Sequence, residues 1–483
     1  MEKHRTNLLE LGNCAGDLRK VRFSQRLIGN EVYGALVSNL GQDSFTNYQH
    51  HVRFEKDDLA VLEKLREVFN LTVDGFASDP DFRAKHPSLD DQSVKEILCN
   101  ESYNLFQFVF RQPYEETMWW AKQHPFSVKV LKLEDVMEKH LGYLFSSEEA
   151  FRVLTELKNF SSATPIALDK KLTIREIGDD DYSKIASTSD QFEAARELGQ
   201  YFCIRGAKTS VIELRIIQST FSDYKIEKPE FGKNRQHPYH RPISEQDLTP
   251  YLWRVISTLR LFQEGNVELG WIYYLLPSPT MKCQFDYPEA LVAPLHSYHL
   301  KDHSNHYHVD SPEKAQAVER FWNLCSDSGL PPRLDRAKRR FVVGYQKHLL
   351  EDELIDLVTC LETLFTTDDK EVSFKACLRA CQIRAAGREF KEKKEVFDLL
   401  RTAYDWRSKL VHGSENNLPE KIRIKASDSE YTNQEFVHSL RQHVREIISL
   451  FLGNSHILSL KPDKLSTYYD NLCLGIDLSE LGS

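Results

Sequence analysis

The sequence has no hydrophobic run long enough to span a bilayer, so we predict no transmembrane helix. Its nine cysteines are scattered and never form a Cys-x-x-Cys pair, so the usual ligand spacing of a zinc site is missing. No secretory signal peptide is evident, and an odd number of cysteines argues against a disulfide framework. Together these absences predict a cytoplasmic protein with reduced thiols and no membrane partner.

A strong net charge is missing as well. The chain has 63 lysines and arginines against 72 aspartates and glutamates, a formal charge of -9, so no overall field attracts nucleic acid. Any contact with RNA must therefore use local basic patches. What is present is the composition of an ordinary soluble protein, 41% hydrophobic and 28% charged, over 483 residues. That length suffices for two or three domains, each with its own core.

Hydrophobic periodicity predicts a mixed α+β N-terminal region. Ser146 and Glu149 fit a capping box at the start of one expected helix. Trp119 and Trp120 suit either a base-stacking platform or the core, and burial statistics favour the core. We expect helices over residues 56–69, 133–145, 148–160, 191–202 and 248–263, and strands over 20–24, 31–37, 104–111, 127–133, 171–177, 210–219 and 267–276.

Polar connectors over 178–190 and 277–312 divide the chain. Histidines in the second connector allow a metal site, but no carboxylate or cysteine stands at a recognised ligand spacing, so exposed linker histidines fit better. These histidines are His296, His299, His303, His306 and His308. The expected parts are an N-terminal α+β region at 1–177, a second part of it at 191–295, a helical bundle at 311–455 and a tail at 456–483.

The last third of the chain predicts helices throughout. Its amphipathic segments are separated by short polar connectors, which is the pattern of an antiparallel helical bundle. Ser311 followed by Pro312 is a typical helix start. The segments are 311–325, 333–349, 352–365, 373–386, 396–413 and 433–452.

The fifth of these segments carries the residues of greatest chemical interest. At about 100° per residue, Arg407 lies beside Leu410 and Val411 in an apolar stripe. A guanidinium there is costly unless it meets an anion. His412 follows in the last turn, where helix carbonyls stabilise imidazolium, and Gly413 is a natural helix stop. An arginine that holds negative charge near a histidine that moves a proton suits phosphodiester chemistry.

The Arg-x4-His spacing proves little by itself. Arg235 and His240 stand in the same relation within a proline-broken loop. Glu362 lies on the apolar side of its own helix and needs a cation, for which Arg407 and Arg379 are the candidates. The alternative interpretation is therefore structural, with a core arginine paired to Glu362 and a histidine that caps helix carbonyls.

Three segments resemble the HEPN domain, and within it the Apea-like group of bacterial anti-phage proteins. They occur in the order and at the separations of that family's pattern, and they read LIDLVTCLETLF at 354–365, FKACLRAC at 374–381 and RSKLVHG at 407–413. The resemblance implies a C-terminal all-α HEPN bundle. It also implies endoribonuclease activity without metal or cofactor, because most HEPN domains that keep both the arginine and the histidine are ribonucleases.

The resemblance further implies roles for particular residues. Arg407 and His412 would be catalytic, with Glu362, Ser408 and Arg379 in support. The 2′-hydroxyl of the RNA would attack the neighbouring phosphate, His412 would act as base or acid, and Arg407 would stabilise the phosphorane. One chain would carry half a site, so a homodimer or higher homo-oligomer would form through the bundle. The RNA substrate includes tRNA among its candidates, and residues 1–310 would sense a phage-derived trigger.

Two basic groups in the same third are candidates for binding the RNA backbone, where contacts position a strand without reading its sequence. Charge runs are most often just solvated faces, which is the competing interpretation. The competing function is a bundle that dimerises and binds nucleic acid without cleaving it. The candidates are Lys375, Arg384, Arg388 and Lys391 in the first group, which continues to Lys393 and Lys394, and Arg339 and Arg340 in the second.

Overall fold

The computed structural model describes residues 2–19, 56–95, 97–98, 101–102, 105, 133–178, 181, 209–219, 245–275, 306–325, 329–345, 347, 349–366, 371–385, 388–424 and 429–474. The chain divides into two compact units: unit 1 is Met1–Leu157, Asp169–Asp247 and Gly270–Pro288, and unit 2 is Lys158–Leu168, Leu248–Leu269 and Glu289–Ser483. This division places two short stretches from the middle of the chain with the C-terminal helices. Within the described residues, no helix combines the length and apolar character needed to cross a membrane.

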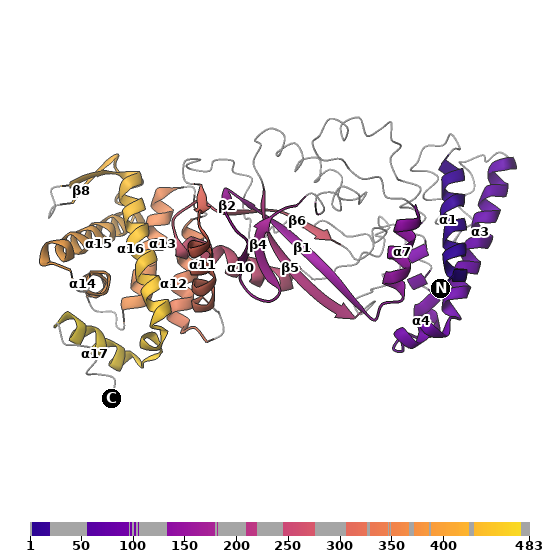
Figure 1. Cartoon of the computed structure of the whole chain (residues 1–483). Coiled ribbons are helices and arrows are strands. Elements are labelled where there is room, and N and C mark those ends of the chain that lie inside the picture. The colour runs from indigo at the N-terminus through magenta and orange to yellow at the C-terminus, as the bar shows by residue number, and fades with distance from the viewer. Residues whose placement is uncertain are drawn as a thin grey trace. The chain divides into compact units, whose positions relative to one another are not determined.

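Unit 1 contains the helices α1 (Glu2–Arg19), α3 (Lys56–Ala77), α4 (Pro80–Lys85) and α7 (Leu133–Leu144). α1 packs along α3 and also against α7 (Figure 1). The ring of His4 stacks on Phe76, and its Nε2 lies 2.6 Å from Oδ2 of Asp79. Because Asp79 also accepts the first backbone amides of α4, one carboxylate joins α1 to the turn between α3 and α4. The helices expected over 56–69 and 133–145 are confirmed.

In unit 1, β1 (Glu148–Lys158) pairs antiparallel with β5 (Ser210–Ser219), and β5 pairs antiparallel with β4 (Leu172–Glu176). The strands of this unit follow the order β4-β5-β1-β6 in their sheet, where β6 is Glu268–Leu275. The register separates two faces, since alternate side chains point to opposite sides. One face is apolar and buried, with Phe151, Val153, Ile212 and Ile174. The other carries charged residues of β1, β4 and β5. The strands expected over 171–177, 210–219 and 267–276 are confirmed.

The helix expected over 148–160 is wrong, because this segment is β1. Its apolar residues fit both periods: Phe151, Leu154 and Leu157 recur at helical spacing, while Phe151, Val153 and Leu157 lie on one face of a strand. Pairing with β5 along the whole strand decides for the sheet, and such a partner, 60 residues away, is not visible locally. Ser146 therefore caps no helix, and its hydroxyl bonds the backbone of Glu148 instead.

Unit 2 is mainly helical. Its long segments are α10 (Glu245–Phe262), α11 (Pro312–Leu324), α12 (Pro332–Gly344), α13 (Leu350–Phe365), α14 (Val372–Arg384), α15 (Phe390–Val411) and α16 (Asn433–Gly453). Ser311 caps α11 by accepting the amide of Lys314, as expected of the Ser-Pro start. Three short strands also belong to this unit, namely β2 (Phe160–Ser162), β3 (Ile166–Ala167) and β7 (Tyr307–Val309). β2 pairs with β7 in parallel.

The core of unit 2 lies around α13, which packs against α12, α14, α15 and α16. Its side chains Leu354, Leu357, Val358, Leu361 and Leu364 are fully or almost fully buried. A helix that is apolar over so much of its circumference is surrounded by others. The helical bundle expected for the last third is thus present in the described residues, and its central helix carries Glu362.

The expectation of helices throughout the last third is wrong at two strands. β8 (Lys421–Ile424) and β9 (Ser429–Thr432) form an antiparallel pair between α15 and α16. The chain then continues past α16 into a 3-10 turn (Ser455–Ser459) and a further helix, α17 (Pro462–Cys473), which packs on α14. The tail that the sequence left unassigned is therefore part of the bundle.

Several expected features lie outside the described residues. They are the strands at 20–24 and 31–37, most of those at 104–111 and 127–133, the helix at 191–202, the loop with Arg235 and His240, Trp119, Trp120, and the histidines His296, His299 and His303.

Candidate functional site

The C-terminal end of α15 is set by a glycine turn. Gly413 has a φ of +72°, a left-handed conformation that costs glycine little. The amide of Ser414 bonds the carbonyl of Lys409 at 3.0 Å, and the amide of Gly413 bonds that of Leu410 at 3.3 Å. This pair of bonds is a Schellman motif, which satisfies carbonyls that would otherwise have no partner. His412 is the C-cap residue and is exposed. The glycine stop expected from the sequence is confirmed.

Arg407 lies on the inner side of α15 and meets Glu362 of α13. Its Nη2 lies 3.3 Å from Oε2 of Glu362, and the two side chains are 28% and 22% exposed. Its Nε is buried and has no acceptor among the described residues. A single 3.3 Å contact to a described residue thus engages this guanidinium, which leaves other N–H donors without a described acceptor.

A tyrosine that the sequence argument did not single out completes this inner cluster. Tyr404 lies one turn before Arg407 and is buried. Burial raises the pKa of its hydroxyl, the neighbouring Glu362 carboxylate raises it further, and Arg407 opposes the shift. Tyr404 is therefore a neutral hydroxyl beside the carboxylate that Arg407 touches. Its position three residues before Arg407, on the same stripe, was the signal that could have identified it.

Helix geometry separates Arg407 and His412 around α15. Five residues of helix advance about 7.5 Å and turn by about 140°, so the two side chains leave α15 in different directions. Arg407 points toward α13, while Ser408 and His412 are exposed. The expectation that the apolar stripe continues through Val411 is wrong, because that side chain is 49% exposed. The last turn of α15 therefore exposes Val411 and the His412 imidazole on the surface of the described chain.

Arg379 does not take the supporting place expected for it beside Glu362. Its Nη1 bonds the carbonyl of Phe365 at 2.8 Å, and its Nη2 bonds Ser466 at 3.0 Å and Asp470 at 3.1 Å. Its guanidinium also lies 5.0 Å from the ring centroid of Tyr469. Arg379 is almost fully buried in these contacts and holds α17 on α14.

Most of the candidate RNA-binding cations are engaged within the chain. Arg339 pairs with Asp335 at 3.0 Å, Arg340 with Asp356 at 3.1 Å, Arg388 with Glu392 at 3.7 Å, and Arg384 with Glu446. Lys375 also has an interaction partner, whereas Lys391 is exposed and forms no ion pair with a described residue. The sequence shows where the cations lie but not which acids the fold brings to them. Pairs on the surface still leave these cations partly available, because each is worth little.

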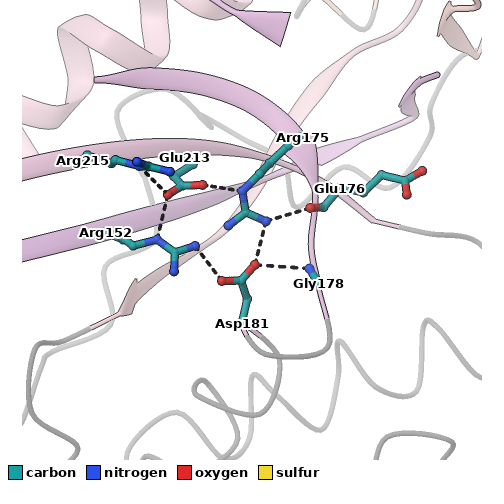
Figure 2. A network of polar contacts seen from close by, with 7 residues as sticks. All are labelled: Arg152, Arg175, Glu176, Gly178, Asp181, Glu213 and Arg215. Atoms are coloured by element: carbon teal, nitrogen blue, oxygen red, sulfur yellow. Dashed lines mark hydrogen bonds and ion pairs between the residues drawn. The ribbon is translucent and has the colours of Figure 1, made fainter. Parts of the chain in front are cut away.

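The charged face of the sheet in unit 1 holds a second polar cluster (Figure 2). Glu213 and Asp181 each bridge Arg152 and Arg175, so two carboxylates and two guanidinium groups alternate in a closed ring. Arg215 adds a third guanidinium to Glu213 from outside, at 3.0 Å. Burial by itself raises the pKa of both acids, but hydrogen bonds and charge from the arginines lower them below their ordinary values.

This ring joins three strands and the segment after β4. Glu213 lies on β5, Arg152 on β1 and Arg175 on β4, while Asp181 follows Gly178, whose amide it accepts. Figure 2 shows the four side chains turned toward one another over the sheet. The ring is electrically neutral, and each of its carboxylates accepts from several donors. We call the four residues Arg152, Arg175, Asp181 and Glu213 the cross-brace of the sheet, because they link three strands.

The two histidines of the connector that are described lie at β7. His306 and His308 have ring centroids 4.3 Å apart, and Nδ1 of His308 lies 2.7 Å from the hydroxyl of Ser161. Within the described part of the chain, no group of three or more histidine, cysteine or acidic side chains is arranged to hold a metal ion.

Comparison with known proteins adds no family. A scan against protein-family models found no match, and searches of curated proteins and of solved structures found no similar protein. The HEPN resemblance stays a prediction from the sequence motifs, and the chemistry of the site rests on the geometry of α13 and α15.

Proposed function

We propose that unit 2 is a metal-independent endoribonuclease whose catalytic residues are Arg407 and His412. The supporting observation is the state of Arg407: a largely buried guanidinium with one 3.3 Å contact to Glu362 and a buried Nε without an acceptor among the described residues. An arginine kept in this state is prepared to bind a phosphate. The exposed His412 at the end of the same helix supplies an imidazole, the side chain that most often serves as a general acid or base.

The reaction is an internal transesterification. The 2′-oxygen of the RNA forms a bond to the neighbouring phosphorus, the bond to the 5′-oxygen breaks, and the products carry a 2′,3′-cyclic phosphate and a 5′-hydroxyl. His412 removes the proton from the 2′-hydroxyl or delivers one to the leaving 5′-oxygen. Arg407 stabilises the added negative charge on the phosphorane. Glu362 holds the guanidinium through the 3.3 Å contact to its Nη2.

The site is shared between two copies of the chain. Since Arg407 and His412 leave α15 about 140° apart, one copy cannot direct both to the same phosphate, whereas a second copy can supply the missing group. The resemblance of the three motifs to the HEPN family supports a biological role for this activity. In that role the protein is an effector of bacterial anti-phage defence that cleaves RNA, with tRNA among the candidate substrates. The resemblance equally supports the role of unit 1 as the part that responds to a trigger.

The test is cleavage of total cellular RNA by the purified full-length protein in the presence of EDTA. We expect His412→Ala to reduce cleavage about 100-fold or more, as loss of a general acid or base does. His456→Ala, an exposed histidine of the same unit, is the matched control and should leave the rate unchanged. The 3′ ends should carry cyclic phosphate. Equal cleavage by wild type and His412→Ala would contradict the proposal.

Mixing two inactive variants tests the shared site. In a random mixture of Arg407→Ala and His412→Ala, half of the dimers contain both chains, and each of these has one intact site, so about a quarter of the wild-type activity should return. No recovery in verified mixed dimers would place both groups in one chain. RNA binding that survives both substitutions, without cleavage in the wild type, would favour the competing function, a binding module in which the Glu362–Arg407 contact is structural.

A further inference from the structure

The outer face of α15 carries phenylalanines and cations in alternation. Positions spaced by four and three residues share one face of a helix. In α15 these positions are Phe390, Lys394, Phe397 and Arg401. Phe390 is 81% exposed, the largest value among the exposed large hydrophobic residues of the described chain. A ring that is this open on a regular helix has no role in the core.

The neighbouring helix extends the aromatic surface. Phe374 of α14 is 45% exposed, and its ring lies 6.0 Å from that of Phe397 in an edge-to-face arrangement. α14 and α15 lie side by side (Figure 1). We call the surface formed by Phe374, Phe390, Lys394, Phe397 and Arg401 the α15 stripe.

The two cations of the α15 stripe differ from most basic residues of the bundle. Lys394 and Arg401 are exposed and form no ion pair with any described residue, whereas Arg384 and Arg388 each pair with a glutamate. Lys394 lies between Phe390 and Phe397 along the helix, and Arg401 follows Phe397. These cations, unpaired among the described residues, and the neighbouring rings offer contacts to a ligand that is at once anionic and aromatic.

The same face leads to the candidate catalytic end. From Arg401 the spacing of four, three and four residues continues to Asp405, Ser408 and His412, all of them exposed. The rise from Arg401 to His412 is about 16 Å along the helix. A chain-like ligand that lies on the α15 stripe is therefore on the same face of the helix as the imidazole.

We propose that the α15 stripe binds single-stranded RNA, with bases stacked on the phenylalanine rings and phosphates on Lys394 and Arg401. This inference rests on the proposed function and names its substrate class as unpaired RNA. Stacking requires bases whose faces are free, which a duplex does not offer. Lys394 favours RNA over a second copy of the chain as the occupant, because lysine is depleted in protein interfaces.

The test is binding of a fluorescent single-stranded RNA in which every 2′-oxygen is methylated, so that cleavage is blocked and only binding is measured. By anisotropy, Phe390→Ala should weaken binding about tenfold, as loss of one stacked base does. Arg401→Ala should lower the slope of log affinity against log salt by about 0.7, the value for one phosphate contact on a single strand. Phe390→Ala should leave that slope unchanged.

Matched controls come from the same unit. Leu349→Ala removes another exposed apolar side chain, and Lys464→Ala removes an exposed cation of α17. Both should bind the methylated RNA like the wild type, and a duplex of the same sequence should bind equally to Phe390→Ala and wild type. Light scattering of each variant reports the oligomer. If Phe390→Ala and Arg401→Ala change the mass of the oligomer but not the affinity for the methylated strand, the α15 stripe is a protein interface and the inference is overturned.

The two proposals fail separately. RNA cleavage that depends on His412, with unchanged binding by the variants of the α15 stripe, would leave the nuclease standing and remove the RNA track. Binding of the methylated strand that depends on Phe390 and Arg401, without any cleavage of natural RNA, would support the track and remove the nuclease.

Discussion

Substitution of Glu213 by glutamine tests the cross-brace of the sheet. The side chain of Glu213 is 2% exposed, and it accepts the Nε of Arg152 at 2.7 Å, that of Arg215 at 3.0 Å and that of Arg175. The amide has the same shape but no charge, so it leaves guanidinium groups without their counter-ion. Breaking a buried pair from one side costs about 3–5 kcal/mol. We expect a loss of about 3 kcal/mol, the lower end, because Arg152 and Arg175 keep Asp181 and some contact with solvent.

Urea denaturation measures this loss. With a slope of about 2 kcal/mol per molar urea, the midpoint of unit 1 should fall by about 1.5 M. The chain has two units and need not unfold in one step, so hydrogen exchange of amides in β1, β4 and β5 should locate the change in the sheet. Arg215→Ala is the control. Arg215 is 68% exposed, and its removal should cost about 0–1 kcal/mol. A midpoint shift for Glu213→Gln no larger than that of Arg215→Ala would refute the reasoning.

The same ring sets a dependence on acid. The pKa values of Asp181 and Glu213 lie below their ordinary values of 3.8 and 4.5, since hydrogen bonds and charge from the arginines outweigh the effect of burial. Their contribution to stability is therefore complete above the unfolded values and is lost as the pH falls through the lower folded ones. Glu213→Gln should flatten the loss of stability of the sheet below about pH 4.5, within the window of these two groups.

Two further predictions concern unit 2. Thr432 and Glu435 form a complete capping box at the start of α16. Thr432→Ala should therefore lower the unfolding free energy by about 1 kcal/mol, measured from the urea midpoint. Thr467→Ala on α17 is the control for the loss of a hydroxyl. Burial, with the charges of Arg384 and Arg388, lowers the pKa of His443 from 6.5 to about 4. The unfolded chain thus takes up a proton that the folded chain does not, and stability should fall as the pH drops from about 6.5 to 4. NMR titration of His443 near pH 6.5 would contradict this, and His443→Leu should remove the slope.

The sequence predicted those elements whose signals are local. Ser311 before a proline marks the start of α11, and Gly413 marks the end of α15, because caps depend on residues within one turn. Glu362 and Arg407 were also expected to meet, since each is a charge on an apolar helix face that requires an opposite charge nearby. These inferences need no knowledge of distant parts of the chain.

The sequence argument failed where a distant partner decides. The segment of β1 is a strand because it pairs with β5. Arg379 bonds Asp470 and Ser466, some 90 residues further along the chain, rather than Glu362. The acids that engage Arg340 and Arg384 are likewise separated from them in sequence or belong to other helices. Tyr404 was overlooked because an aromatic residue on an apolar stripe looks like core until its hydroxyl is placed beside a carboxylate.

The contacts of Arg379 with Ser466 and Asp470 of α17 determine where the chain can be truncated without loss of the bundle. A fragment ending at residue 455 would match the boundary expected from the sequence, yet it would strip Arg379 of Ser466 and Asp470. It would also uncover Phe365, whose ring lies 5.5 Å from that of Tyr469. Without α17, Arg379 lacks its acceptors on that helix and the ring of Phe365 is exposed to solvent. We expect the shortened fragment to aggregate for this reason. Recombinant versions of the bundle should accordingly extend to at least residue 474.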